Sequence, residues 1–236
     1  MVFEVPPLTR RSPLLKLHHL NNSRSQRVLW MLEELGVDYE LIRYERNAKT
    51  MLAPPELKAI HPLGKSPVLT DGDLVIAESA VILEYLVGKY GKGGFVPAEG
   101  TPEKLRYTYW MHYAEGSLMP LLLLKLVMTQ VEKSPMPFFV KPIAKRITQS
   151  VNKAFIGPNL ETHLGFIESE LAKSAFFAGN ELTAADVQMS FPVEAATTRA
   201  KIDAKSHPKL FDFLDSIHGR PAYRRALKKG GEYKLG

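Results

Sequence analysis

Residues 14–44 read LLKLHHLNNSRSQRVLWMLEELGVDYELIRY, and this stretch decides the fold. It opens with a short apolar run from Leu14 to Leu20, which is suited to a buried strand. Apolar residues then recur at helical spacing, and Gly36 supplies a C-terminal stop; they are Val28, Leu29, Leu32 and Leu35. Tyr39 to Tyr44 alternates again as a strand. The segment therefore predicts a β-α-β unit.

The sequence that follows completes a small domain of strands and helices. Pro54 to Ile60 predicts a short helix, and Asp71-Gly72 is a hairpin turn signal between strands at Pro67–Thr70 and Leu74–Ile76. Helical spacing returns from Ser79 to Lys89. The order β-α-β-α-β-β-α predicts a mixed sheet with helices on its faces.

The second half of the chain contains helical patterns only. No convincing strand follows Gly91-Lys92-Gly93-Gly94. Thr101 and Pro102 form an N-cap and first-turn pair, which predicts a helix to about Val131 with a bend near Gly116 or Pro120. Further helices are expected at roughly Lys141–Lys173, Thr183–Ala200, Pro208–Ile217 and Pro221–Lys229.

These patterns divide the chain into four parts. We predict an N-terminal extension at residues 1–13, an α/β domain at 14–92, a linker at 93–101 and an all-helical (all-α) domain at 102–236. Thr183 and Asp186 have the spacing of a capping box, which we interpret as structural.

The composition excludes several classes of chemistry. Of 236 residues, 45% are apolar and 24% charged, which describes a globular chain rather than a disordered one. Because the chain has no cysteine, it has no cysteine nucleophile, no disulfide and no thiolate metal site. Any sulfur chemistry must come from a ligand. The net charge of +6 comes from basic residues clustered near the chain ends, so we expect no nucleic-acid binding.

The sequence also carries no targeting or membrane signal. The longest apolar run, Leu118 to Met128, is interrupted by Pro120 and Lys125, and a bilayer crossing needs about 18 to 20 residues. The N-terminus lacks the apolar core of a secretory signal. We expect a cytoplasmic protein without a membrane span.

Several familiar motifs fail on inspection. Gly64-Lys65-Ser66 is like the end of a phosphate-binding loop, but position 59 is Ala59 and Pro67 follows at once. The histidines show no metal-binding spacing, and the neighbours His18 and His19 on a strand point to opposite faces. The motifs GxSxG and GxGxxG are missing, which argues against hydrolases and dehydrogenases. No metal site is predicted.

Three polar clusters remain. Asn21 to Arg27 lies before the first helix, where free backbone N–H groups stabilise an anion, although Ser23 with Gln26, or Ser25 alone, could simply cap the helix. Glu78-Ser79 lies before the third helix, where Ser79 and the free N–H groups could hold a carboxylate or where Ser79 could simply cap the helix. Ser66-Pro67 opens a strand, and a cis bond there would leave the backbone of Ser66 able to pair with an extended peptide.

The order of these clusters along the chain resembles that of a known protein family. The stretches LNNSRSQRVLWMLEELGVDYEL, HPLGKSPVL, IAESAVILEYL and ELTAADVQMSFPVEAA are similar to cytosolic glutathione S-transferases. The likeness runs from about Leu14 to Tyr223 and is greatest for serine-type members of bacteria and fungi that carry SRSQR. It implies a thioredoxin-like glutathione-binding domain followed by an all-helical domain, a detoxifying transferase and a homodimer.

The resemblance also implies the site, with glutathione as co-substrate and no metal. Ser23 takes the place of the catalytic serine, with Asn22 and Ser25 as rivals for the thiol contact. Ser66 and Pro67 match the residue and cis-proline that pair with the cysteinyl backbone of glutathione. Glu78 and Ser79 match the groups that hold the γ-glutamyl end, and Lys65 lies where a basic residue approaches the tripeptide.

The expected chemistry is activation of a thiol. A free thiol with a pKa of about 8.5 is mostly protonated at neutral pH, and the Ser23 hydroxyl would stabilise the thiolate. The sulfur would attack a small-molecule electrophile, or a hydroperoxide, in an apolar pocket for which the candidates are Tyr109, His112, Tyr113 and Met119. The alternatives are a non-catalytic glutathione-binding protein and an interaction scaffold that uses the basic residues from Arg220 onward.

Overall fold

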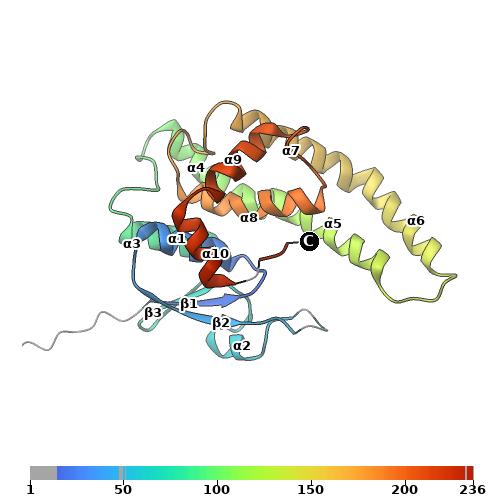
Figure 1. Cartoon of the computed structure of the whole chain (residues 1–236), viewed down its shortest axis with the longest axis horizontal. Helices are drawn as coiled ribbons and strands as arrows, with labels where there is room; N and C mark the ends of the chain where they lie inside the picture. The colour runs from blue at the N-terminus through green and yellow to red at the C-terminus, as the bar shows by residue number, and fades with distance from the viewer. Residues whose placement is uncertain (1–14, 48–49, 51, 232, 236) are drawn as a thin grey trace, which may run out of the picture.

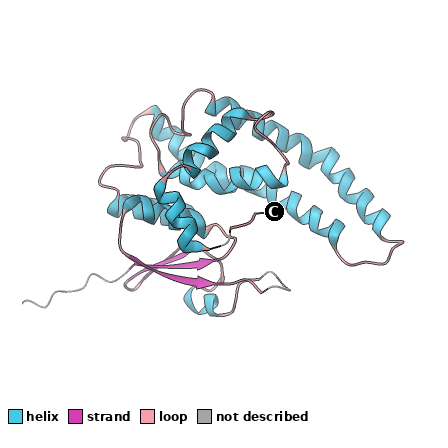
Figure 2. Ribbon diagram, viewed as in Figure 1, coloured by secondary structure: helices cyan, strands magenta, loops and turns pink. Residues whose placement is uncertain are grey.

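A computed structural model describes residues 15–47, 50, 52–231 and 233–235. The N-terminal half holds a four-stranded sheet of order β2-β1-β3-β4. Its strands are β1 (Leu15–Leu20), β2 (Tyr39–Tyr44), β3 (Val68–Asp71) and β4 (Leu74–Ala77). Strand β1 is parallel to β2 and antiparallel to β3, and β4 returns antiparallel to β3. The predicted mixed sheet is confirmed (Figure 2).

The helices of this domain are α1 (Ser25–Leu35), α2 (Glu56–Ile60) and α3 (Ser79–Tyr90), so the predicted thioredoxin-like order β-α-β-α-β-β-α is also confirmed. Helix α1 is the buried one. It packs against β1, α3, α8 and α10, because apolar side chains recur along its length. It ends at Gly36, whose φ of 62° lies in the left-handed region that glycine adopts without steric strain.

The second half contains helices, as predicted. They are α4 (Pro102–Tyr113), the π-helical turn η1 (Ala114–Leu118), α5 (Met119–Lys133), α6 (Lys141–Val151), the π-helical turn η2 (Asn152–Ile156), α7 (Gly157–Leu171), α8 (Ala184–Arg199), α9 (Pro208–His218) and α10 (Pro221–Gly230). In the described residues of this half, the only β pairing is an isolated bridge between Phe176 and Gly179. The all-helical assignment is confirmed, and residues 93–101 contain neither helix nor strand.

The two π-helical turns have a common cause. Each is followed, two residues after its end, by a proline: Pro120 after η1 and Pro158 after η2. A proline has no N–H for the bond to the residue four before it, so the helix rewinds locally. The bend was expected near Gly116 or Pro120, and the structure has the π-helical turn η1 at this place; the helix expected at Lys141–Lys173 contains the second π-helical turn, η2.

Figure 1 shows α5 and α6 extending as a helical hairpin from the body, while α10 lies beside α1. By length and apolar composition alone, Pro102–Lys133 is the one described segment that could also cross a bilayer. It packs against α8 and α6 in this fold, although only 28% of its apolar stretch is buried. The predicted extension at residues 1–13 lies outside the described residues.

Candidate functional site

The segments that carry the predicted polar residues come together near the carboxyl end of β1. Ser66 precedes β3, and its hydroxyl donates to the carbonyl of His18 at 2.9 Å and accepts from the amide of Leu20 at 3.1 Å. The Ser66–Pro67 peptide bond is cis. Ser66 is therefore fixed against the last residues of β1, with its neighbour Lys65 exposed.

Glu78 and Ser79 reach the same edge through β4. Ala77 pairs with Val68, so the residue after β4 lies beside the start of β3. Glu78 has a φ of 70°, a conformation that a residue with a side chain rarely adopts, and its side chain is exposed. Ser79 is buried at the first turn of α3. The backbone amides of that turn can donate hydrogen bonds to a carboxylate.

Ser23 occupies the loop between β1 and α1, only 5% exposed. Its hydroxyl donates to the carbonyl of Leu20 at 2.7 Å, lies 2.8 Å from the Ser25 hydroxyl, and accepts from the Ser25 amide at 3.2 Å. The N-cap of α1 is Arg24, without a side-chain cap bond. The capping box proposed for Ser23 and Gln26 is therefore wrong, because only the backbones of these two residues are bonded.

His19 is a member of this network that the sequence reasoning missed. Its Nδ1 lies 2.7 Å from the Ser25 hydroxyl, while His18 faces the other side of the sheet and bonds the Tyr44 hydroxyl at 2.9 Å. The expected opposite orientation of the two histidines is confirmed. Burial, reinforced by the nearby charge of Arg43, lowers the pKa of His19 to about 4, so its imidazole is neutral at physiological pH.

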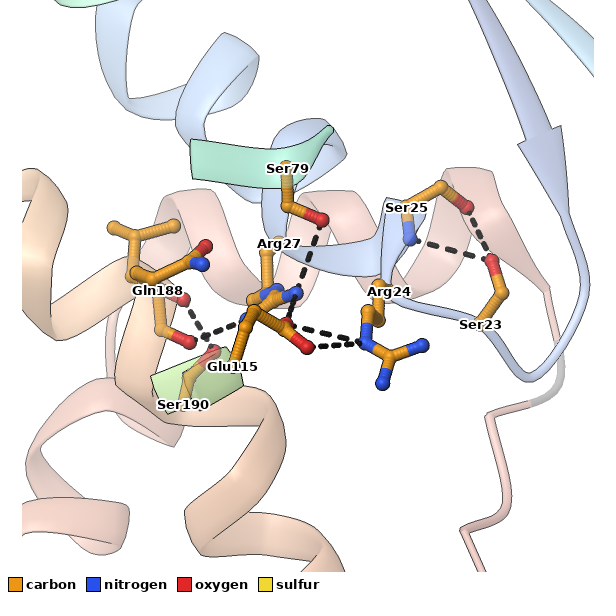
Figure 3. A network of polar contacts seen from close by, with 9 residues as sticks. Ser23, Arg24, Ser25, Arg27, Ser79, Glu115, Gln188 and Ser190 are labelled. Carbon is orange, nitrogen blue, oxygen red and sulfur yellow. Dashed lines mark hydrogen bonds and ion pairs between the residues drawn. The ribbon is translucent and has the colours of Figure 1, made fainter. Parts of the chain in front are cut away.

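Beneath the loop, Arg27 joins the two domains (Figure 3). It is 1% exposed and donates to the Gln188 carbonyl at 2.6 Å, the Ser79 hydroxyl at 3.0 Å and the Glu115 carboxylate at 2.5 Å. Arg24 donates to the same carboxylate at 3.1 Å. Burial lowers the pKa of Arg27, and the two arginines hold the pKa of Glu115 below its usual range despite its burial.

Glu115 was not predicted from the sequence, and neither was the Arg27 bond to Ser79. A carboxylate on η1 lies about ninety positions from its partners in the chain, so no local pattern marks it. The hydrogen bond from Arg27 holds the Ser79 hydroxyl in place. Because Arg27 only donates to the Ser79 oxygen, the Ser79 hydroxyl proton stays available to an anion in front of α3.

The four candidates for an electrophile pocket lie apart from this network. Tyr109 packs edge-on against Phe166 of α7, and the Tyr113 hydroxyl bonds the His163 ring of the same helix. Met119 is buried in the core, and His112 is exposed. Tyr109 and Tyr113 share one helical face, whereas Glu115 lies two residues further, on the opposite side. The structure therefore brings Glu115, rather than these tyrosines, to the Ser23 loop.

Asn22, the other rival for the thiol contact, is turned toward the C-terminal tail. Its side-chain oxygen accepts from the amide of Lys234 at 2.5 Å, and its backbone has a φ of 49°.

Among the residues that the structure describes, no group of three His, Cys, Asp or Glu side chains could hold a metal ion. The groups assembled at the site are hydroxyls and backbone amides, which suit an anionic or peptide group, and the Glu78 carboxylate, which suits an ammonium group.

Known proteins match both halves of the chain. The model for the glutathione S-transferase N-terminal domain matches residues 12–88, and that for the C-terminal domain matches residues 132–229. Glutathione S-transferase 3 of Schizosaccharomyces pombe is 38% identical over 216 residues, which are 92% of this chain and 88% of that protein. Glutathione S-transferase 1 of Saccharomyces cerevisiae is 31% identical over 224 residues, 92% of this chain and 95% of that one.

Solved structures that resemble this chain belong to the same family as the matching sequences. The crystal structure of a glutathione S-transferase from Actinobacillus pleuropneumoniae is 32% identical, with a TM-score of 0.76 over 94% of this chain and 95% of that one. A sphingomonad glutathione S-transferase, solved in complex with glutathione, has the same fold at 23% identity, with a TM-score of 0.71 over 92% and 98% of the two chains. The chain belongs to the glutathione S-transferase family.

Proposed function

We propose that this protein is a serine-type glutathione transferase in which the Ser23 hydroxyl donates a hydrogen bond to the sulfur of bound glutathione. One observation carries the proposal: Ser23, Ser66 and Ser79 come from three separate segments and meet at the carboxyl end of β1, held by bonds to Leu20, His18 and Arg27. Ser23 lies at the N-terminus of α1, where the helix dipole also favours a negative sulfur.

The remaining site residues bind different parts of the glutathione tripeptide. The backbone of Ser66, next to Pro67, pairs with the cysteinyl residue of glutathione. Glu78 and Ser79, with the first amides of α3, hold the γ-glutamyl end, and Lys65 approaches a carboxylate from the exposed side. The sphingomonad relative was solved with glutathione bound, which supports the choice of ligand.

The chemical step follows from a lower thiol pKa. A shift of about two units below the free value of about 8.5 requires roughly 2.7 kcal/mol of preference for the thiolate. A hydrogen bond to a charged group contributes about 1.5–3 kcal/mol, and a helix N-terminus about 0.3–1 kcal/mol. Ser23 and α1 together therefore suffice. The thiolate attacks an electrophilic carbon and displaces its leaving group, such as the chloride of a chloronitrobenzene. With a hydroperoxide it attacks the terminal oxygen and breaks the O–O bond, which releases the alcohol and leaves a glutathione sulfenic acid that a second glutathione converts to the disulfide and water. Ser23 forms no covalent bond to the substrate.

The electrophile binds beside the sulfur, against the helical domain. The four predicted pocket residues lie apart from the Ser23 network, so their contact with the electrophile stays a prediction; Tyr109 and His112 are exposed, whereas Tyr113 and Met119 are held in the core. We also propose that the protein is a cytoplasmic homodimer, as is typical of the family. Sedimentation equilibrium tests the dimer, because a monomer would give the mass of one 26.5 kDa chain.

The test is Ser23→Ala, assayed with glutathione and a chloronitrobenzene. Turnover should fall at least tenfold, while glutathione still binds with nearly unchanged affinity. Ser190→Ala is the matched control, because it removes an equally buried hydroxyl, bonded to Val187 at 2.9 Å, from α8. Unchanged turnover in Ser23→Ala would contradict the assignment. A wild-type protein that binds glutathione without forming a thiolate would be the non-catalytic alternative.

A further inference from the structure

Two hydroxyls and one imidazole lie in a row behind the proposed thiol position. The Ser23 and Ser25 oxygens are 2.8 Å apart, and the Ser25 oxygen is 2.7 Å from Nδ1 of His19. Ser25 and His19 are buried, at 0% and 3% exposure. A serine hydroxyl has one proton to donate. The direction of these bonds therefore decides which serine has a proton left for the sulfur.

His19 fixes that direction. On the α10 side the backbone of Gly230 raises the pKa of His19, as a carbonyl that accepts from the ring does, so we assign the ring proton to the nitrogen that faces α10. The charged group facing it from β2 is Arg43, its partner in the strand register, which disfavours a second proton. With burial, this keeps the imidazole neutral, so Nδ1 has a free lone pair and accepts the proton of Ser25.

We propose that His19 is a positioning residue: by holding the Ser25 proton, it makes Ser25 an acceptor and leaves Ser23 as the one hydroxyl that donates to the sulfur of glutathione. This inference rests on the proposed function. It decides between Ser23 and Ser25 as the donor to the thiol, because each hydroxyl has only one proton to donate and the proton of Ser25 is bonded to His19. It also gives His19 a part in thiol activation, although the imidazole does not touch the ligand.

The Ser23 proton is free to turn to the ligand. Its other acceptors are neutral, namely the Leu20 carbonyl at 2.7 Å and the Ser25 oxygen at 2.8 Å. A thiolate is charged, and a hydrogen bond to a charged acceptor is roughly twice as strong as one between neutral groups. The Ser23 hydroxyl therefore rotates to donate its proton to the sulfur when the thiolate forms, while the Ser25 hydroxyl continues to donate to His19.

The experiment measures the pKa of bound glutathione from the thiolate absorbance at about 240 nm as a function of pH. Ser23→Ala should raise this pKa by about one to two units, and Ser25→Ala by less than about half a unit. An increase with Ser25→Ala equal to that with Ser23→Ala would overturn the inference, because Ser25 would then be a donor. This comparison does not depend on any His19 variant folding.

A double-mutant cycle tests His19 itself. His19→Leu releases the Ser25 proton, which can then replace the missing Ser23 donor, so Ser23→Ala should raise the thiol pKa by half as much or less in that background. Adding Ser25→Ala should abolish the compensation. His19→Asn keeps an acceptor oxygen near the Nδ1 position and should behave like the wild type. A purely structural role for His19 would not produce compensation that depends on Ser25.

Tyr44→Phe is the matched control, because it removes a hydroxyl–imidazole bond of 2.9 Å on the opposite face of the sheet. It should leave the cycle unchanged. Equal effects of Ser23→Ala in the wild-type and His19→Leu backgrounds would overturn the His19 inference alone. If the wild-type complex forms no thiolate, or Ser23→Ala leaves the thiol pKa unchanged, the proposed function fails first, and the two failures are thus distinguished.

Discussion

Replacing Arg27 with methionine should destabilise the protein by about 3 kcal/mol, because it breaks a buried polar contact between the two domains. The substitution keeps the side-chain volume and removes three hydrogen bonds, to Gln188, Ser79 and Glu115. Removing one partner of a buried ion pair costs about 3–5 kcal/mol. The lower end applies here, because the Glu115 side chain is 34% exposed and keeps Arg24 as a partner.

Urea unfolding and calorimetry at a fixed protein concentration provide the measurement. For a chain of 236 residues, about 3 kcal/mol corresponds to a fall in Tm of roughly 6–10 °C. Arg24→Met is the control: its side chain is 38% exposed, so it should cost less than about 1 kcal/mol. The double variant Arg27→Met/Glu115→Leu should lose less than the sum of the two single variants. A loss below about 1 kcal/mol in Arg27→Met would refute the reasoning.

Three further predictions concern stability. Because the pKa of Glu115 is lowered in the folded protein, its contribution is present above the unfolded value of about 4.3 and is lost as pH falls through the folded value; Glu115→Gln should reduce the acid sensitivity of the urea midpoint. Gly230→Ala places a methyl group 2.8 Å from the Gln26 side-chain oxygen and 3.0 Å from the buried Leu29 side chain and should cost about 1 kcal/mol or more in urea unfolding, whereas no loss would mean that the Gln26 amide turns away and Leu29 gives way. Asp186→Ala leaves two buried amides and a hydroxyl without their acceptor and should lower stability by about 4 kcal/mol; a circular-dichroism melt within about 2 °C of the wild type would contradict it.

Local patterns in the sequence were sufficient for the fold. The change from alternating to helical spacing, together with the stop at Gly36, placed each helix and strand of the first domain within a few residues, and Thr101 with Pro102 marked the start of α4. The capping box at Thr183 and Asp186 is present, because both partners lie within one helical turn. Signals of this kind depend on neighbours in the chain and need no tertiary information.

The candidate site was only partly accessible from the sequence. Ser23 and Gln26 have capping-box spacing, yet the Ser23 hydroxyl bonds the end of β1 instead, so a local rule gave way to a tertiary contact. His19 was recognised as facing away from His18, but its bond to Ser25 depends on how α1 packs on β1. Glu115 required knowledge of which face of the long helix meets the first domain.

The most direct test of the central claim is a pH titration of the thiolate absorbance of glutathione bound to the wild-type protein and to Ser23→Ala. A pKa about two units below the free value of about 8.5 is expected in the wild type, with most of that shift lost in the variant. A bound thiol that titrates like free glutathione in the wild type, or an identical shift in both proteins, would contradict activation by Ser23.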